Sequence, residues 1–228
     1  FSKIGYVSEN QRLPEWMRVP DFLSYCKPFY PTWDDAVAAA LVEHFELPPD
    51  RPLRAQSRGM RVKAALASSL AYRPRLLMLD EPFSGLDALV RDQLIEGVLE
   101  RSSDATVFLA SHDLAEIESF ASHIGYLEGG RLRFVEETGA LSDRFREIEV
   151  TLEAPAELPR DWPGHWLNPE QASVVVRFCD SRFEPDRSQA DIRRMFPAAR
   201  GVSVRGMPLR SIFVALAKAA KKGESTCA

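Results

Sequence analysis

Short apolar runs alternate with segments of helical spacing between residues 60 and 127, and this alternation constrains the fold most strongly. Predicted helices cover residues 61–72, 89–100 and a segment through Phe120, and predicted strands cover residues 76–79, 106–110 and 123–127. Strands that alternate with helices form a mostly parallel sheet with helices on its faces. The sequence therefore predicts an α/β fold for this part of the chain.

Two adjacent carboxylates, Asp80 and Glu81, directly follow the apolar run of residues 76–79. Burying a lone carboxylate is costly, so both are expected where the strand emerges from the core. The next predicted strand is followed by His112. Because ligands bind at the carboxyl ends of parallel strands, these side chains are candidates for one site. A solvated strand end remains the simpler interpretation of the acidic pair.

The segment "LLMLDEPFSGLD", residues 76–87, resembles the Walker B motif and D-loop of an ABC-type ATPase. The resemblance implies that Asp80 holds Mg²⁺, that Glu81 orients and activates the attacking water, and that Asp87 helps to join two such domains. A hard divalent cation prefers oxygen ligands, and water attack on a γ-phosphate needs charge neutralisation and a positioned base. Two neighbouring carboxylates at a strand end suit both needs.

The segment "QSRGM", residues 56–60, resembles the ABC signature in a variant form made of Ser57, Arg58, Gly59 and Met60. Gly59 lets the backbone come close to a ligand. Ser57, together with the free N–H groups of a helix N-terminus, makes an anion site suited to a γ-phosphate. An ordinary serine N-cap is the alternative interpretation of this segment.

Two further segments resemble the same family. The strand "TVFLASHD" ends in His112, similar to the switch histidine that contacts the γ-phosphate, and "IGYVSEN" resembles the Q-loop strand. Glu9 stands where many family members have glutamine, and the resemblance implies that it binds Mg²⁺ or its waters. A single histidine at a strand end is more often structural. The four segments follow the family's order and spacing, and the resemblance covers roughly residues 1–135.

The resemblance implies a P-loop NTPase-like, mostly parallel sheet within an ABC ATPase domain at residues 1–146, with a helical subdomain inserted at about 10–58. In this family the subdomain docks onto a transporter's membrane helices. Residues 13–34, "LPEWMRVPDFLSYCKPFYPTWD", look most like the exporter-type branch. Within the subdomain, Thr32 is the predicted N-cap of the helix that follows it.

The family resemblance also implies cofactors and partners. ATP and Mg²⁺ are the expected cofactors, and two nucleotide-binding domains, in a homo- or heterodimer, are expected to sandwich two ATP molecules. The expected partner is a transmembrane permease subunit, which places the protein at the cytoplasmic face of a membrane. The implied function is an ATPase subunit that powers transport. The alternative is a catalytically silent ABC-fold binding or regulatory protein.

The sequence contains no G-x-x-x-x-G-K-[ST] motif, which cradles the β- and γ-phosphates in this family. The nearest string, "GYLEGGR" at residues 125–131, ends in Arg-Leu and is predicted to be a plain β-turn. In the family the P-loop precedes the Q-loop, so we expect a chain that is truncated at its N-terminus. Such a chain is expected to bind ATP poorly and to be inactive alone.

Net charge, the length of apolar runs and the cysteine content bear on the possible partners and location of the protein. A formal net charge of −4 gives no electrostatic reason to expect nucleic acid as a partner. Apolar runs such as residues 36–42 are far shorter than the about 20 residues that span a bilayer. Three widely spaced cysteines, Cys26, Cys179 and Cys227, suit reduced thiols in a cytosol.

Residues 147–228 are predicted to form a separate small α+β domain. Apolar residues alternate at Ile148, Val150 and Leu152 and again around residues 174–178, whereas helical spacing appears at residues 192–196 and 209–216. No catalytic arrangement stands out in this tail. Regulation or a dimer contact is a hypothesis based on position alone.

Overall fold

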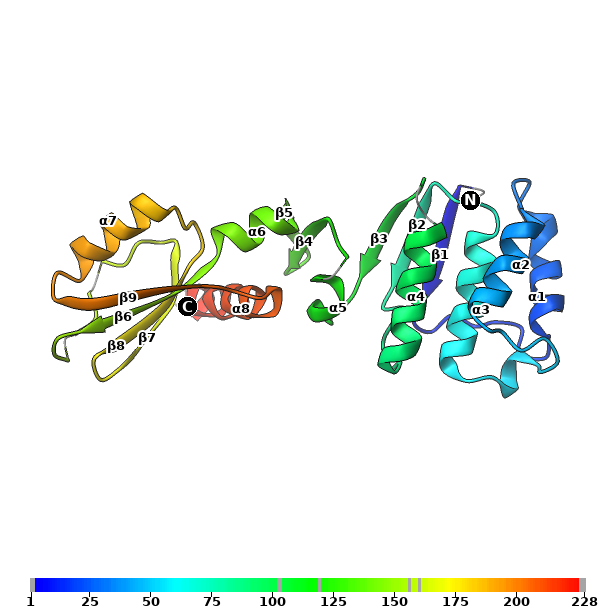
Figure 1. Ribbon diagram of the computed structural model, residues 1–228, viewed down its shortest axis with the longest axis horizontal. Helices are drawn as coiled ribbons and strands as arrows, with labels where there is room; N and C mark the ends of the chain where they lie inside the picture. Colours follow the sequence, from blue (N-terminus) through cyan, green and yellow to red (C-terminus); the bar gives the residue numbers. More distant parts are fainter. Residues whose placement is uncertain (1–2, 102–103, 119, 156, 160, 226–228) are drawn as a thin grey trace. The chain divides into compact units, whose positions relative to one another are not determined.

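A computed structural model describes residues 3–101, 104–118, 120–155, 157–159 and 161–225. The chain falls into two compact units, Phe1–His112 and Asp113–Ala228, which are described separately below (Figure 1). Cys26 and Cys179 are free thiols, and Cys227 lies outside the described residues. None of the described helices is both long enough and apolar enough to span a membrane.

The first unit is built on a parallel sheet with the strand order β1-β2-β3. Its strands are β1 (Ile4–Ser8), β2 (Leu76–Asp80) and β3 (Thr106–Ala110). The register places Ser8, Asp80 and Ala110 side by side, so the carboxyl ends of the strands meet at one edge. The predicted parallel α/β fold is confirmed, and β2 and β3 lie within one residue of the predicted bounds. The strand predicted at residues 123–127 forms, but it pairs antiparallel in a separate sheet.

Helices connect these strands, and two short 3₁₀ turns join the helices. The elements are α1 (Val19–Cys26), η1 (Lys27–Phe29), α2 (Asp35–His44), η2 (Leu53–Ala55), α3 (Arg58–Leu70) and α4 (Ala88–Arg101). Helix α3 is the central one, because nearly all of its residues are buried and it contacts β1, α1, α2 and α4. In Figure 1, α1, α2 and α3 lie together on the side of this unit away from β3.

The prediction that Thr32 caps helix α2 is wrong. The Asp34 side chain accepts hydrogen bonds from the Ala36 and Val37 backbone N–H groups at 2.9 and 3.1 Å. Asp34 is the last extended residue before the helix, so its carboxylate faces the unpaired N–H groups of the first turn. The Thr32 hydroxyl instead donates to the Tyr72 carbonyl at 2.7 Å.

The second unit begins with helix α5 (Leu114–Glu118) and a hairpin of β4 (His123–Glu128) and β5 (Arg131–Glu137). Gly129 and Gly130, at the turn, have φ values of 56° and 73°. Two successive residues with positive φ make the tight hairpin turn that favours glycine. In the segment "GYLEGGR", residues 125–128 therefore belong to β4 and the two glycines form the predicted turn, so the segment is not a phosphate loop.

A four-stranded antiparallel sheet with the order β7-β8-β6-β9 follows the short helix α6 (Thr138–Arg144). Its elements are β6 (Arg146–Leu152), β7 (Trp166–Ala172), β8 (Val175–Asp180), α7 (Pro185–Met195), β9 (Ala199–Gly206) and the terminal α8 (Leu209–Ser225). Ile148, Val150 and Leu152 alternate toward a core that also contains Phe178 and the α7 residue Ile192. The expected alternation of buried residues is present in β6.

The sheet of the second unit starts at the domain boundary proposed after Arg146, but the contacts divide the chain earlier, after His112. The α8 residue Phe213 packs against Tyr126 of β4, with ring centroids 5.0 Å apart. Phe213 also lies near Phe134 of β5. Because α8 packs on the hairpin, the hairpin belongs to the second compact unit.

Candidate functional site

The edge formed by the carboxyl ends of β1, β2 and β3 brings the backbones of three candidate residues, Glu9, Asp80 and Glu81, close together. The Glu9 N–H donates to the Asp80 carbonyl at 2.8 Å, and the Glu81 N–H donates to the Ala110 carbonyl at 2.9 Å. These two bonds extend the strand register past the ends of the strands. Glu9, Asp80 and Glu81 therefore start from neighbouring backbone positions, and His112 follows two residues after β3.

Glu81 and His112 are in direct contact. His112 Nδ1 lies 2.7 Å from Glu81 Oε2, at hydrogen-bond distance. Glu81 adopts a φ of 49°, a region that residues other than glycine rarely occupy. Such strain persists where the surrounding structure enforces it, and it is concentrated at functional sites. Contact with the imidazole can hold the Glu81 carboxylate in one orientation.

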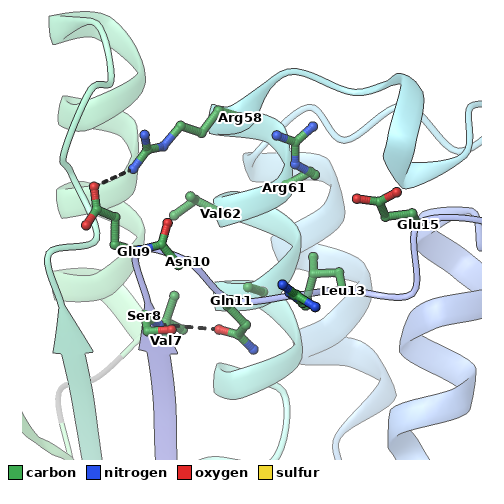
Figure 2. Close-up of a pocket in the computed structure, with 12 residues that line it drawn as sticks. Val7, Ser8, Glu9, Asn10, Gln11, Leu13, Glu15, Arg58, Arg61 and Val62 are labelled. Carbon is green, nitrogen blue, oxygen red and sulfur yellow. Dashed lines mark hydrogen bonds and ion pairs between the residues drawn. The ribbon is translucent and has the colours of Figure 1, made fainter.

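Glu9 is held by two side chains from elsewhere in the first unit. Arg58 Nη2 donates to Glu9 Oε1 at 3.1 Å, and Ser84 Oγ donates to the same oxygen at 2.9 Å. The hydrogen bond from Ser84 and then that from Arg58 lower the pKa of Glu9. The carboxylate is thus already ionised at a pH where an ordinary glutamate is still partly protonated. Figure 2 shows Arg58 reaching from α3 to Glu9.

A hollow of about 260 Å³ adjoins this contact between the segment after β1 and helix α3 (Figure 2). Glu9 and Glu15 supply its carboxylates, and its guanidinium groups come from Arg12, Arg58 and Arg61. The sequence motifs pointed to Glu9 and Arg58 separately. They gave no sign that the two side chains form an ion pair, or that Ser84 joins them.

Substituting Ser84 or Arg58 with alanine is expected to raise the pKa of Glu9 toward its ordinary value, because each substitution removes a hydrogen bond that favours the charged form. The measurement is an NMR pH titration of the Glu9 carboxyl carbon. Arg61→Ala is the matched control, since Arg61 lines the same hollow without bonding Glu9. A Glu9 titration curve that is identical in Ser84→Ala and wild type would contradict this assignment.

The signature-like residues have structural roles at the start of α3. Ser57 Oγ accepts a hydrogen bond from the Met60 N–H at 3.2 Å, so Ser57 is the N-cap of α3. A methyl group on Gly59 would lie 2.8 Å from Val90 Cγ1. Asp87 likewise accepts a hydrogen bond from the Val90 N–H at 3.0 Å in the first turn of α4. The role of these residues toward a nucleotide stays a prediction.

Gly59→Ala is expected to destabilise the first unit by about 1–3 kcal/mol, the usual cost of overpacking, because its new methyl group meets Val90. The double variant Gly59→Ala/Val90→Ala should lose less than the sum of the two single variants, since the clash is then relieved. The free energies of unfolding of the single and double variants, measured in urea, check both expectations. Gly139→Ala is the control, because nothing lies within 4 Å of its new methyl group. Additive effects of Gly59→Ala and Val90→Ala would contradict the close approach.

The donor set at the sheet edge fits Mg²⁺ bound together with a phosphate-bearing ligand. Among the described residues there is no group of three histidine, cysteine, aspartate or glutamate side chains that could hold a metal alone. Mg²⁺ in phosphate-transfer sites uses one or two protein carboxylates and completes its shell with phosphate oxygens and water. Asp80 and Glu9, whose backbones are adjacent at the strand ends, could supply these carboxylates.

Residues 2–84 match the family model of the ABC transporter. This part of the chain is similar to members of the ABC transporter family. Glu9, Asp80 and Glu81 lie inside this match, and His112 lies outside it. The family resemblance seen in the motifs is therefore confirmed, and so is the fold that it implied.

Relatives of known name agree with this assignment. The chain is 39% identical over 199 residues to the aliphatic sulfonates import ATP-binding protein SsuB of Ralstonia nicotianae, covering 83% of this chain and 62% of the relative. It is 30% identical over 131 residues to the ABC transporter ATP-binding protein YtrB of Bacillus subtilis, covering 57% and 45%. The molybdenum import ATP-binding protein ModC of Brucella abortus is 32% identical over 158 residues, covering 66% and 42%. The chain spans about half the length of these curated relatives.

A solved structure described as the ATP-binding subunit of an ABC transporter has a similar fold. Its TM-score is 0.56 at 24% sequence identity, and the match covers 62% of each chain. At this identity the likeness concerns the fold alone. It agrees with the parallel sheet and helices of the first unit.

Proposed function

We propose that the complete protein is the ATP-binding and ATP-hydrolysing subunit of a membrane ABC transporter. The observation that carries the proposal is the contact of 2.7 Å between Glu81 and His112, made beside Asp80 at the carboxyl edge of a parallel sheet. A carboxylate held by an imidazole is a suitable base for activating water. The family match of residues 2–84 supports the same conclusion.

Each residue at the edge has a proposed task. Glu81 accepts the proton of the attacking water, and His112 orients Glu81 and contacts the γ-phosphate. Asp80 and Glu9 would hold Mg²⁺ directly or through its waters. When bound, Mg²⁺ would neutralise charge on the phosphates. The bonds from Arg58 and Ser84 both reach Glu9 Oε1, so a contact between Glu9 and the metal would use Oε2 or would replace these bonds.

The remaining motif residues are proposed to act between two nucleotide-binding domains. Ser57, Arg58, Gly59 and Met60, at the N-terminus of α3, would face the nucleotide of a partner domain in a homo- or heterodimer. The capped helix N-terminus offers N–H groups to a phosphate, which supports this role. Asp87 would help to join the two domains. A transmembrane permease subunit is the proposed partner, with the protein peripheral on the cytoplasmic face.

The direction of transport is a separate question from the ATPase role. SsuB and ModC are named as import proteins. These relatives give no support to the exporter-type resemblance of residues 13–34. The ATPase role proposed here does not depend on that subclass.

The 228-residue chain alone is expected to bind ATP weakly and to show no steady hydrolysis, because its sequence lacks the phosphate-cradling motif. The complete protein is expected to do both. Titration with a fluorescent ATP analogue and a phosphate-release assay on the two proteins measure the difference. Steady turnover by the chain alone, lost on Glu81→Gln, would contradict the first expectation. ATP binding without hydrolysis by the complete protein would favour a silent regulatory role.

A further inference from the structure

A groove of about 790 Å³ lies between helix α7 and strand β9 in the second unit. Its apolar lining comes from residues on the helix, on the strand and in the segment that precedes the helix, namely Phe183, Ile192, Phe196, Val202 and Val204. Ile192 and Phe196 also belong to the hydrophobic core of this unit. The groove is therefore an extension of the core to the surface.

Strand β9 is the edge of the four-stranded sheet and, among the described residues, it pairs only with β6. Val202 and Val204 are each 44% exposed, whereas their register partners Val150 and Ile148 are fully buried. The apolar face of the sheet thus extends onto β9, where its valines are only partly covered by other residues. An open strand edge beside an apolar groove is the geometry that accepts an added strand.

The charged side chains that line the groove indicate what kind of segment would bind there. Arg193 of α7 and Arg200 of β9 line it, and within the described part of the chain neither makes an ion pair. The neighbouring α7 arginines Arg187 and Arg194 are paired with Glu184 and Asp191. Asp186 is the carboxylate that lines the groove. The groove therefore has an excess of unpaired positive charge.

A second copy of the chain suits this edge poorly. Strand β9 reads "ARGVSVRG", with two arginines and no acidic residue. Antiparallel pairing of β9 with its own copy would bring four arginines onto two adjacent strands, and like charges that face each other across strands are destabilising. A segment carrying carboxylates would instead complement Arg193 and Arg200.

We propose that this groove binds an extended, acidic segment of a partner protein, which adds to β9 as a further strand. The backbone of the segment pairs with the open edge, and every second side chain faces the groove. Among these groove-facing side chains, the apolar ones cover Val202 and Val204, and the carboxylates that follow them meet Arg193 and Arg200. This proposal is independent of the ATPase role of the first unit.

The test uses a fluorescently labelled peptide, acetyl-SVSVSESE-amide, whose valines and glutamates all lie on one face of an extended strand, and the matching peptide with lysine in place of glutamate. The 228-residue chain is expected to bind the glutamate peptide saturably at submillimolar concentration and the lysine peptide at least about tenfold more weakly. Arg193→Glu/Arg200→Glu should reverse this preference. Arg187→Glu/Arg194→Glu, the same charge change on α7 away from the groove, should preserve it.

Amide hydrogen exchange adds a second readout, in which bound peptide should slow exchange in β9 and leave β7, at the opposite edge, unchanged. Absence of saturable binding up to millimolar peptide would overturn the proposal. Equal weakening by both charge-reversal pairs would overturn it as well. A dimer seen by sedimentation that protects β9 and excludes the peptide would assign the groove to a second copy instead.

Discussion

Glu81→Gln in the complete protein is expected to lower ATP hydrolysis by about 10²- to 10⁴-fold, the range lost when a general base is removed. Glutamine keeps the size of the side chain but cannot accept a proton from water. It can still take part in a hydrogen bond with His112, so the local geometry should survive. ATP binding and domain closure should therefore remain. The rate of phosphate release and the Kd for ATP measure the two effects separately.

Glu100→Gln is the matched control, because this glutamate is exposed on α4 and lies away from the strand ends. It should leave hydrolysis within about twofold of normal, as exposed substitutions usually do. A Glu81→Gln protein that hydrolyses ATP near the normal rate would remove Glu81 from its role as base. Loss of both hydrolysis and ATP binding would point to a structural role instead.

Phe178→Ala is expected to destabilise the second unit by about 3–5 kcal/mol, the usual cost of deleting a buried aromatic ring. Phe178 is 3% exposed, and its ring centroid lies 4.3 Å from that of Trp166 and 5.3 Å from that of Trp162. Removal of the ring leaves a cavity under both tryptophans. Because both report on this core, tryptophan fluorescence during urea unfolding can follow the loss.

Phe29→Ala is the control for that measurement, since it deletes the same atoms from a side chain that is 63% exposed. Its expected effect is below about 0.5 kcal/mol. A loss of less than about 1 kcal/mol for Phe178→Ala would show that the aromatic cluster contributes little to the fold. The predicted core of the second unit would then be wrong.

The strands and helices of the first unit could be predicted from the sequence because their signals are local. Apolar runs of four or five residues marked β2 and β3, and helical spacing marked α3 and α4. Capping was less predictable at α2, where Thr32, Asp34 and Asp35 all lie near the helix start. Only the backbone conformation of Asp34, together with the tertiary partner of Thr32, identifies the cap.

The site could be predicted as a set of residues but not as a set of contacts. Strand-end positions indicated Glu9, Asp80, Glu81 and His112, and a parallel sheet brings such ends to one edge. The ion pair between Glu9 and Arg58 was not predicted. Each residue belongs to a different motif, and the distance between two motifs depends on how α3 packs against β1.

Local sequence patterns were enough to identify the strand ends, the helix starts to within a few positions, and the family that the first unit resembles. Those properties follow from spacing and residue type over a few neighbouring positions. The tertiary structure alone decided the partners: His112 lies 31 positions from Glu81, Arg58 lies 49 from Glu9 and Ser84 lies 75 from Glu9. Contacts at such separations depend on packing of the whole unit, which no local pattern encodes.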